Sequence, residues 1–441
     1  MEQKYIKEAF DTNWVVPLGP NVNAFEEDLR QFSIHNSQGT IIPGLENKRV
    51  VALSSGTAAV HLGLLAAGVK AGDEVIVQSF TFCASTHPIT YLGATPILVD
   101  SEPDTWNIDP VLMEEAIKDR IAKTGKKPAA IVPVALYGMP YKADRIMEIA
   151  NRYEIPVIED AAEGLGSRYK GQVLGTFGKY GVLSFNGNKM ITTSGGGALI
   201  TENEDEWREI MMYATQYRES YPYYQHEKIG YNYRMSNICA GIGRGQMTVL
   251  DQHLKHHKHV QALYEELLKD VKGIHVHSQP SRIGELENNV YDSNYWLVTI
   301  TIEEDVKVKG QENAYKTIVK GAVGGAAGVI HVAESATTDC QPNENVEALR
   351  VFMDAAGIEA RPLWKPMHCQ PVYRAPLNEE LRIKNEELPN GVICQTSGSS
   401  VAYVNGVSEA LFKVGMCLPA GPYVTDDDVR YIVETIKDAI V

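Results

Sequence analysis

The strongest constraint on the fold is an alternation of short apolar segments with amphipathic ones between residues 48 and 200. Segments with the composition of buried strands are AGDEVIVQSF, ATPILVD, AAIVPVAL, IPVIED, YGVLSF and GGALIT. Between several of them lie segments such as PVLMEEAIKDRIA and ADRIMEIANRYE, whose apolar residues recur at helical spacing. Parallel strands need such crossovers, which place helices on the faces of a sheet. We therefore predict an α/β fold with a mostly parallel central sheet sandwiched by helices.

The chain is also too long for one small core, at 441 residues, so we expect more than one domain. The predicted division is an N-terminal arm over 1–20, a large domain over 21–270 that ends in a long linking helix from Asn237 to about Val271, and a smaller C-terminal α+β domain over 271–441. Residues near 303–345 include the glycine-rich run KGAVGGAAG. No strand–loop–helix context surrounds this run, so it predicts a flexible insertion rather than a phosphate loop.

Charge and composition narrow the function classes. Lys and Arg number 41 against 56 Asp and Glu, a net charge of −15, and an acidic chain without a basic cluster disfavours nucleic acid as a partner. The sequence contains no apolar stretch of about 18 residues, so we predict no membrane span. The opening MEQKYIKEAFDTNW lacks the apolar segment of a secretory signal. The six cysteines are scattered without a C-x-x-C pair. We therefore expect a cytoplasmic protein with reduced thiols.

Candidate chemistry lies where strands end, because ligands of doubly wound sheets collect at the carboxyl ends of strands. The first candidate is Ser54-Ser55-Gly56-Thr57, which follows RVVAL and opens a helix. Free N–H groups and the helix dipole favour a phosphate there, and Gly56 allows close approach. A simple helix cap is the other interpretation of the same residues.

Two further strand ends carry an acid and an aromatic ring. In VIEDAAEGLGS, Asp160 ends an apolar strand and Glu163 follows three residues later. Asp160 could cap the next helix, or it could be a buried carboxylate that needs a cation. Phe82 follows the strand EVIV and could either fill the core or stack on a planar ligand.

The last candidate is Lys189, the one cation in VLSFNGNKMITTSGGG. It follows the predicted strand YGVLSF, with Ser184 five residues before it, and precedes three glycines, which we expect to allow a sharp turn. A lysine with apolar flanks and few acids nearby can act as a nucleophilic amine. The alternative is an exposed lysine in a polar loop.

Taken together, a phosphate cup, an acid, a flat apolar ring and a nucleophilic lysine match the needs of pyridoxal 5′-phosphate. A metal fits less well. His253 and His257 lie one turn apart on a predicted helix in HLKHHKH, but no third ligand is evident. We therefore expect no metal site.

Many motifs occur in the order found in one family. They include NWVVPLGPNVNAFEEDL, SSGTAAVHLGL, FTFCASTHPI, VIEDAAEGLGS, SFNGNKMITTSGGG, GYNYRMSNICAGIGRGQ, GIEARPLWKPMHCQPVY and CLPAG. On these motifs the chain resembles the DegT/DnrJ/EryC1/StrS group of aminotransferases that act on nucleotide-linked sugars. The resemblance covers nearly the whole chain and implies a fold-type-I aminotransferase.

The resemblance also implies roles for individual residues. Lys189 would form the Schiff base with the cofactor, and its retention favours transamination over the dehydratase branch, which has histidine there. Asp160 would pair with the pyridine nitrogen, and Glu163, which stands where glutamine is common, would lie near the ring's 3-hydroxyl. Further implied cofactor contacts are Phe82 on the ring, Gly56, Thr57 and Ser184 on the phosphate, and Asn232, which would reach the phosphate from the neighbouring subunit. Implied substrate contacts are His87, Tyr231, Lys365 and His368.

The implied reaction takes an amino group from glutamate, releases 2-oxoglutarate, and aminates a keto-sugar in a homodimer with shared active sites. The motifs look most like enzymes that aminate C4 of UDP-linked 4-keto-6-deoxy-N-acetylglucosamine. A 3-keto sugar and a dTDP- or GDP-linked sugar remain alternatives. From a different class, a non-catalytic regulator that binds pyridoxal phosphate is disfavoured by the acidic charge and the lack of a DNA-binding segment.

Overall fold

The computed structural model describes residues 1–280, 290–315, 319–320, 331–332, 340–374, 384–388, 392–397 and 399–441. At its centre two sheets meet edge to edge, with strand orders β1–β9–β8–β5 and β4–β2–β3–β18–β17–β16. Parallel bridges from Ile131 to Val157 and from Val134 to Asp160 join β4 to β5. The strands are β1 (Arg49–Leu53), β9 (Gly197–Thr201), β8 (Tyr180–Ser184), β5 (Ile158–Asp160), β4 (Ala130–Val132), β2 (Glu74–Gln78), β3 (Thr95–Val99), β18 (Val401–Val404), β17 (Ile393–Thr396) and β16 (Lys384–Glu387).

The centre of this large sheet is parallel and its margins are antiparallel. β8 pairs parallel with β5, and β2 pairs parallel with both β3 and β4, whereas β9 runs antiparallel to β1 and β8. The predicted α/β class with a mostly parallel sheet is therefore confirmed.

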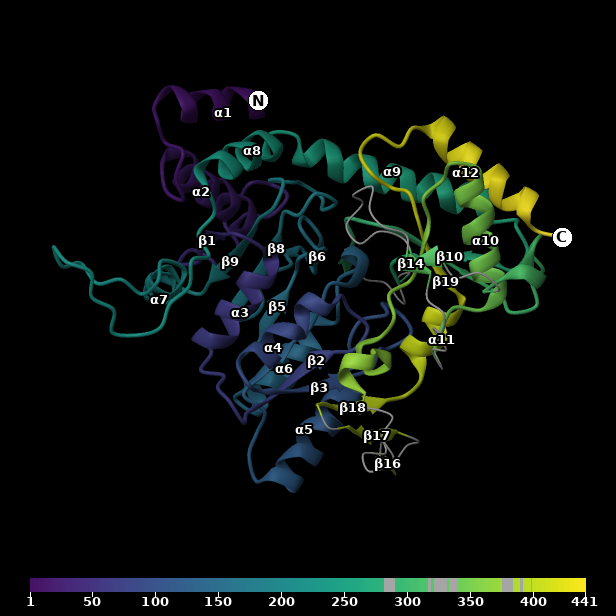
Figure 1. The fold of residues 1–441 in the computed structure, drawn as a ribbon, viewed down its shortest axis with the longest axis horizontal. Coiled ribbons are helices and arrows are strands. Elements are labelled where there is room, and N and C mark those ends of the chain that lie inside the picture. Colours follow the sequence, from purple (N-terminus) through teal and green to yellow (C-terminus); the bar gives the residue numbers. More distant parts are fainter. Residues whose placement is uncertain are drawn as a thin grey trace.

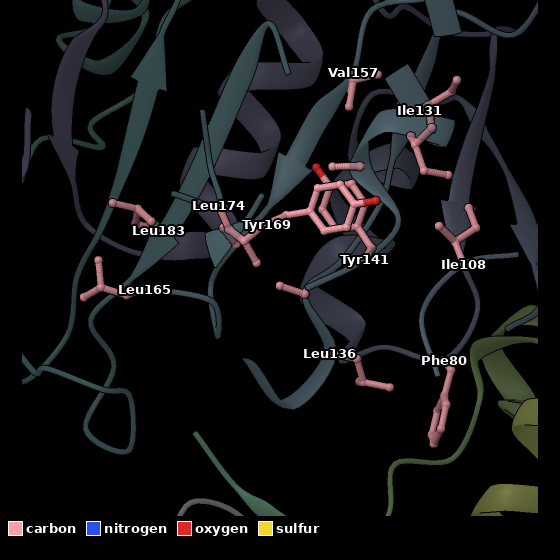
Figure 2. Close-up of a cluster of buried hydrophobic side chains, with 14 of the residues drawn as sticks. Phe80, Ile108, Ile131, Leu136, Tyr141, Val157, Leu165, Tyr169, Leu174 and Leu183 are labelled. Carbon is pink, nitrogen blue, oxygen red and sulfur yellow. The ribbon is translucent and has the colours of Figure 1, made fainter. Parts of the chain in front are cut away.

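Both faces of the sheet are buried, as the continuous apolar runs of the strands require. Alternate residues of one strand enter different hydrophobic clusters: Ile76 of β2 belongs to one, and Val75 and Val77 belong to the other. The first cluster receives α2 (Pro20–Ile34), α5 (Pro110–Thr124) and α6 (Ala143–Arg152), and the second receives α3 (Gly56–Ala66), α4 (His87–Tyr91) and α7 (Glu204–Ala214). Figure 2 shows part of the first cluster, in which the aromatic side chains of Tyr141 and Tyr169 lie with aliphatic ones such as Ile131 of β4 and Leu183 of β8.

Local sequence explains where these helices begin and end. The Oγ of Ser55 accepts the N–H of Ala58 at the start of α3, and Asp109 does the same for α5, so each satisfies an orphan donor. Gly125 ends α5 with a φ of 71°, the left-handed conformation that glycine adopts without steric cost.

A second core lies toward the C-terminus. Its antiparallel sheet has the order β10–β12–β19–β15 and packs against three helices through residues such as Tyr264, Ile300 and Leu349. The elements are β10 (Ile274–Val276), β12 (Val298–Ile302), β19 (Gly415–Leu418), β15 (Arg361–Pro362), α9 (Leu250–Leu268), α10 (Glu344–Ala355) and α12 (Asp426–Ala439). In Figure 1 these elements lie beside the large sheet, with α9 crossing above both.

The predicted long linking helix is two helices in the structure. α8 (Asn237–Met247) ends before Thr248, and α9 starts at Leu250. The N–H of Thr248 bonds to the carbonyl of Gly245, a tightened last turn. α1 (Glu2–Asp11) and α2 pack against α8 (Figure 1), and a Cβ on Gly243 would lie 2.6 Å from the ring of Phe25. Glycines that admit this close packing weaken the helix, and the β-branched pair Thr248-Val249 follows them.

One segment departs from the predicted division of the chain. Residues 384–404 lie within the predicted small domain, yet β18 pairs parallel with β3 of the large sheet, and β17 and β16 extend that edge. The boundary between the large and small domains at residue 270 thus remains a proposal, and the strands β16, β17 and β18 belong to the large sheet. The predicted insertion near 303–345 lies partly outside the described residues, which omit 316–318, 321–330 and 333–339.

The remaining elements are short. They are β6 (Arg168–Tyr169), β7 (Gln172–Val173) and β11 (Tyr291–Asp292) in one sheet, the pair β13 (Val319–Lys320) and β14 (His331–Val332), and α11 (Val407–Val414). Within the described part of the chain, none of the helices has the length and apolar character needed to cross a lipid bilayer.

Candidate active site

The carboxyl ends of four strands meet at one edge of the large sheet. β1, β2, β5 and β8 all point the same way, because β1 and β8 are each antiparallel to β9 and the others are joined by parallel pairs or bridges. At this edge lies a cavity of about 710 Å³. Its lining includes seven of the residues predicted from sequence: Gly56, Thr57, Phe82, Asp160, Glu163, Ser184 and Lys189.

The turn after β1 contains a helix cap and also forms part of the cavity wall. Ser55 is the N-cap of α3, while Gly56 and Thr57 line the cavity at the N-terminus of this 11-residue helix. Ser184 packs against this turn. Its Cβ lies 3.0 Å from the position that a Cβ on Gly56 would take. Unpaired N–H groups and the helix dipole suit a phosphate at this point.

Asp160 is a buried carboxylate and not a helix cap. Strands and turns, but no helix, follow it in the described segment up to Glu204. Its oxygens accept hydrogen bonds from Ser85 Oγ at 2.6 Å and from the N–H of Ala162 at 3.1 Å. Burial raises the pKa of Asp160, and the bond from Ser85 opposes that rise. A buried acid of this kind is stabilised by a cation brought to it.

Glu163 is held by both of its oxygens. Oε2 accepts the N–H of Tyr137 at 2.7 Å, and Oε1 lies 3.3 Å from Lys189 Nζ. Burial raises the pKa of Glu163 to about 7, although Lys189 opposes the rise. Tyr137 has a φ of 54°, a strained backbone conformation for a bulky residue, and it aims its N–H at the carboxylate.

Lys189 lies inside the cavity wall, with 13% of its side chain exposed. Few acids lie near Lys189 in the sequence, but in the fold its Nζ lies 3.3 Å from Glu163 Oε1 and 4.1 Å from the centre of the Trp296 ring. The glycines after it also act differently from the prediction. Ser194 makes the left-handed turn, with a φ of 71°, whereas Gly197 leaves room for the backbone of Ser55, which a Cβ would meet at 2.3 Å.

Phe82 and Trp364 separate this cavity from a second one of about 360 Å³, and both line each cavity. Phe82 is 52% exposed, and its ring centre lies 5.5 Å from that of Trp364. The second cavity is also lined by His87 and Lys365. Phe82 therefore does not fill the core, and two predicted substrate residues lie together next to it.

Three other predicted residues line neither of the two cavities in the part of the chain that the structure describes. His368 is buried and its Nδ1 is 2.7 Å from Ser79 Oγ. Tyr231 is half-buried and stacks on Tyr233, with ring centres 5.0 Å apart. Asn232 is exposed and its backbone pairs with Thr215. These positions do not support a contact between any of the three residues and a ligand in either cavity of the same chain.

Sequence reasoning missed Ser85, Trp296 and Trp364. Ser85 had a weak signal, since it lies three residues after Phe82 in a motif already singled out. Trp364 likewise lies next to Lys365 in WKPMH. Trp296 had no signal, because it reaches Lys189 from a segment more than one hundred residues later in the chain.

The histidines of α9 each bind a structural partner. His253, His256 and His257 lie within hydrogen-bond distance of the carbonyls of Met190, Gly421 and Tyr295 respectively. His259 contacts Asp426. These partners orient the rings separately, which explains why the sequence cluster forms no common ligand set.

The donor set fits pyridoxal phosphate. A helix N-terminus with Gly56, Thr57 and Ser184 faces the same cavity as a buried acid, an amine and an exposed ring. This combination defines the class of pyridoxal-phosphate enzymes built on an open α/β sheet.

Comparison with known proteins sharpens the class. The sequence model of the DegT/DnrJ/EryC1/StrS aminotransferase family matches residues 1–322. EpsN of Bacillus subtilis strain 168, provisionally named a pyridoxal phosphate-dependent aminotransferase, is 38% identical over 435 residues, which are 99% of this chain and 92% of EpsN. A GDP-perosamine synthase of Escherichia coli O157:H7 is 30% identical over 437 residues, 99% of this chain and 95% of that protein.

A solved structure shares the fold. A DegT DnrJ EryC1 StrS aminotransferase from Brucella abortus aligns with a TM-score of 0.75 at 24% identity, over 99% of this chain and 94% of that one. The chain belongs to the DegT/DnrJ/EryC1/StrS aminotransferase family and is a pyridoxal-phosphate-dependent aminotransferase. The family, the cofactor and the enzyme class predicted from sequence are thereby confirmed.

Proposed function

We propose that this aminotransferase moves an amino group from glutamate to C4 of a nucleotide-linked 4-keto-6-deoxy sugar, with UDP-4-keto-6-deoxy-N-acetylglucosamine as the favoured substrate. The observation that carries the proposal is the convergence of Asp160, Glu163 and Lys189 in one cavity, next to a second cavity of a size that suits a ligand. The choice of sugar rests on the motifs of the sequence. A cytoplasmic location stays part of the same proposal.

The residues divide the work by position. When bound, pyridoxal phosphate supplies the electron sink that lets an amino group leave one carbon and join another. Gly56, Thr57 and Ser184 would hold its phosphate at the N-terminus of α3. Asp160 would keep a proton on the ring nitrogen, because a buried carboxylate stabilises a cation beside it.

Lys189 would attach the cofactor and, when free, carry the transferred proton on Nζ. Glu163 lies close enough to Nζ to hold or exchange that proton, at 3.3 Å. The Trp296 ring lies 4.1 Å from the amine and would help to exclude water from it. The proton is thus kept inside the cavity between two named atoms, Nζ and Oε1.

The second cavity would receive the sugar nucleotide. His87 and Lys365 line it, with Trp364 at its junction with the main cavity. A lysine and a histidine can bind phosphate oxygens, and aromatic rings can stack on a base or pack on a sugar.

The deciding experiment is mass spectrometry of products after incubation with glutamate and a panel of nucleotide keto-sugars. The panel should pair UDP, GDP and dTDP carriers with 4-keto and 3-keto sugars. The GDP arm matters because a GDP-perosamine synthase is among the relatives. We expect the largest kcat/KM for the UDP-linked 4-keto sugar. Preference for another carrier or for C3 would overturn the substrate assignment and leave the enzyme class intact.

We also propose a homodimer with shared active sites. After α7, the segment 216–230 projects from the body of the protein (Figure 1). It exposes Tyr221, Tyr223, Tyr224 and Ile229, an apolar content typical of an interface. Asn232 lies just after the C-terminal end of this segment, is exposed and does not line the cavity of its own chain, so a partner's cavity is the site it would serve.

Subunit mixing tests this arrangement. A Lys189→Ala protein and an Asn232→Ala protein, each nearly inactive at limiting cofactor, would be mixed and allowed to exchange. Each heterodimer contains one site with both residues intact, so equal mixing should restore about a quarter of wild-type activity. Verified exchange without recovery would show that Asn232 does not act across an interface.

A further inference from the structure

Two cysteines and a carboxylate converge at the base of the loop that carries Trp364 and Lys365. The donor atoms of Cys340, Cys369 and Glu409 all lie within 4.8 Å of one another. Cys369 Sγ is 3.8 Å from Glu409 Oε2. The three residues come from separate segments: Cys340 precedes α10, Cys369 ends a short 3₁₀ helix (Met367–Cys369), and Glu409 lies in α11. The cysteines that seemed scattered in sequence are neighbours in the fold.

The two thiols are buried in an apolar cluster, beside the half-buried carboxylate of Glu409. Cys340 and Cys369 are 2% and 1% exposed and pack against Phe412. The Cys369 thiol has one proton and two acceptors, Glu409 and the sulfur of Cys340. Two sulfur atoms and a carboxylate oxygen that converge in this way form a donor set that a cation would stabilise.

The geometry suits a tetrahedral ion. With a Zn–S bond of about 2.3 Å and a Zn–O bond of about 2.1 Å, adjacent sulfur and oxygen ligands of a tetrahedron lie about 3.6 Å apart. The observed separation of 3.8 Å between Cys369 and Glu409 is close to that value. Thiolate sulfur selects zinc over magnesium or calcium, which prefer oxygen ligands.

We infer that Cys340, Cys369 and Glu409 form a site for a thiophilic divalent cation, with zinc as the expected ion and a water as the fourth ligand. Binding would release the thiol protons to solvent, leaving two thiolates and a carboxylate around a doubly charged ion. The resulting excess of one negative charge is balanced by Lys413, whose Nζ is 2.8 Å from the other oxygen of Glu409.

Such an ion would join the loop that carries Trp364 and Lys365 to the helix α11. Cys369 lies five residues after Trp364, which lines both cavities, and Glu409 lies on a helix behind the loop. The site therefore has a positioning role, because none of its three ligands lines either cavity as the described residues form them. This inference does not depend on which sugar the enzyme uses.

The test is metal content and cobalt binding of the untagged holoenzyme. Wild-type protein purified from zinc-supplemented cells and passed through a weak chelator should retain about one zinc per chain. Cys340→Ser and Cys369→Ser proteins should retain less than about a tenth of that, since each loses a ligand. Cys394→Ser is the matched control, because Cys394 is equally buried, at 1% exposed, in β17, and it should retain wild-type zinc content.

Cobalt chloride added to chelator-stripped wild-type protein should give a sulfur-to-cobalt charge-transfer absorption that zinc then removes. This measurement uses no substitution, so it holds even where a variant folds poorly. Stripped wild-type protein that binds neither ion would overturn the inference. So would a disulfide between Cys340 and Cys369 in freshly isolated protein, found by mass spectrometry without reduction, or undiminished zinc in the Cys369→Ser protein.

Discussion

The two walls of the main cavity are built in different ways. One wall consists of strand ends of the large sheet and carries the charged groups Asp160, Glu163 and Lys189. The other wall comes from the second sheet, where the start of β12 lies beside the end of β19, as the pairing of Val298 with Leu418 shows. That wall is mostly aromatic or apolar, with Trp296 and Trp364, and its charged residues Glu359 and Arg361 pair with each other.

The difference separates chemistry from enclosure. The strand ends of a rigid parallel sheet hold charged groups in fixed positions, which is what a cofactor requires. The second wall brings aromatic faces to the same space and joins it to the second cavity. We therefore expect changes in the first wall to act on kcat and changes in the second wall to act on KM.

The largest effect should come from Lys189→Ala. On the proposed roles, removing the amine would remove both cofactor attachment and proton transfer, so turnover should fall by about 10³–10⁴-fold. Borohydride reduction of the wild-type holoenzyme followed by peptide mapping should place the cofactor on Lys189. Lys179→Ala, at a lysine paired with Glu206 outside the cavity, is the control and should retain activity. A cofactor adduct on another lysine would refute the assignment.

Asp160→Asn should have the next largest effect. The substitution keeps the shape and removes the charge, so a proton on the ring nitrogen would lose its proposed partner and turnover should fall by about 10²–10³-fold. Asp160→Glu keeps the charge and should lose less if the longer side chain is accommodated. Steady-state kinetics with glutamate measure both. Wild-type turnover in the Asn variant would show that the carboxylate acts only through its hydrogen bonds to Ser85 and Ala162.

Glu163→Gln should change how stability depends on pH. The folded carboxyl has a pKa raised from 4.5 to about 7 by burial, so between these values the native state holds a proton that the unfolded chain has lost. Stability of the cofactor-free wild type should therefore fall, relative to Glu163→Gln, as pH rises from about 4.5 to about 7, by up to about 3 kcal/mol.

Urea unfolding of both cofactor-free proteins at several pH values measures that difference. Above about pH 7 the difference should level off, because Glu163 is then ionised in both states. A constant difference across the whole range would mean that Glu163 titrates normally in the folded protein.

Trp364→Ala tests the second wall and should have the smallest effect. The ring separates the two cavities and contacts Phe82 and Tyr137, so its loss should raise KM for the sugar nucleotide about tenfold, or about 1.4 kcal/mol. The kcat and the absorbance of the bound cofactor should change little, and Trp364→Phe should keep most of the affinity. A large fall in kcat with unchanged KM would place the residue with the first wall instead.

The charged wall was largely predictable from sequence, for a local reason. Asp160 and Ser184 end apolar strands, and Gly56 and Phe82 follow strands within a few residues. Parallel strands place such positions at one edge whatever the rest of the chain does. The alternation of strands and helices is equally local, and it predicted the sheet and the elements that form its two faces.

Other features depended on contacts that no local pattern records. The break between α8 and α9 follows from the close packing of α1 and α2 on a glycine-rich helix. The pairing of β18 with β3 joins residues about three hundred positions apart. The partners of Lys189 and the proximity of Cys340 to Cys369 are likewise products of domain packing.

By itself the sequence determined the α/β class, the strand ends that carry the chemistry, and the family with its cofactor. Periodicity, turn residues and ordered motifs act over short stretches and therefore survive without a structure. Only the tertiary structure decided that Lys189 has Glu163 and Trp296 as partners, that His368 is turned away from the cavities, and that two distant thiols meet. These outcomes depend on how separate segments pack, which a linear pattern does not contain.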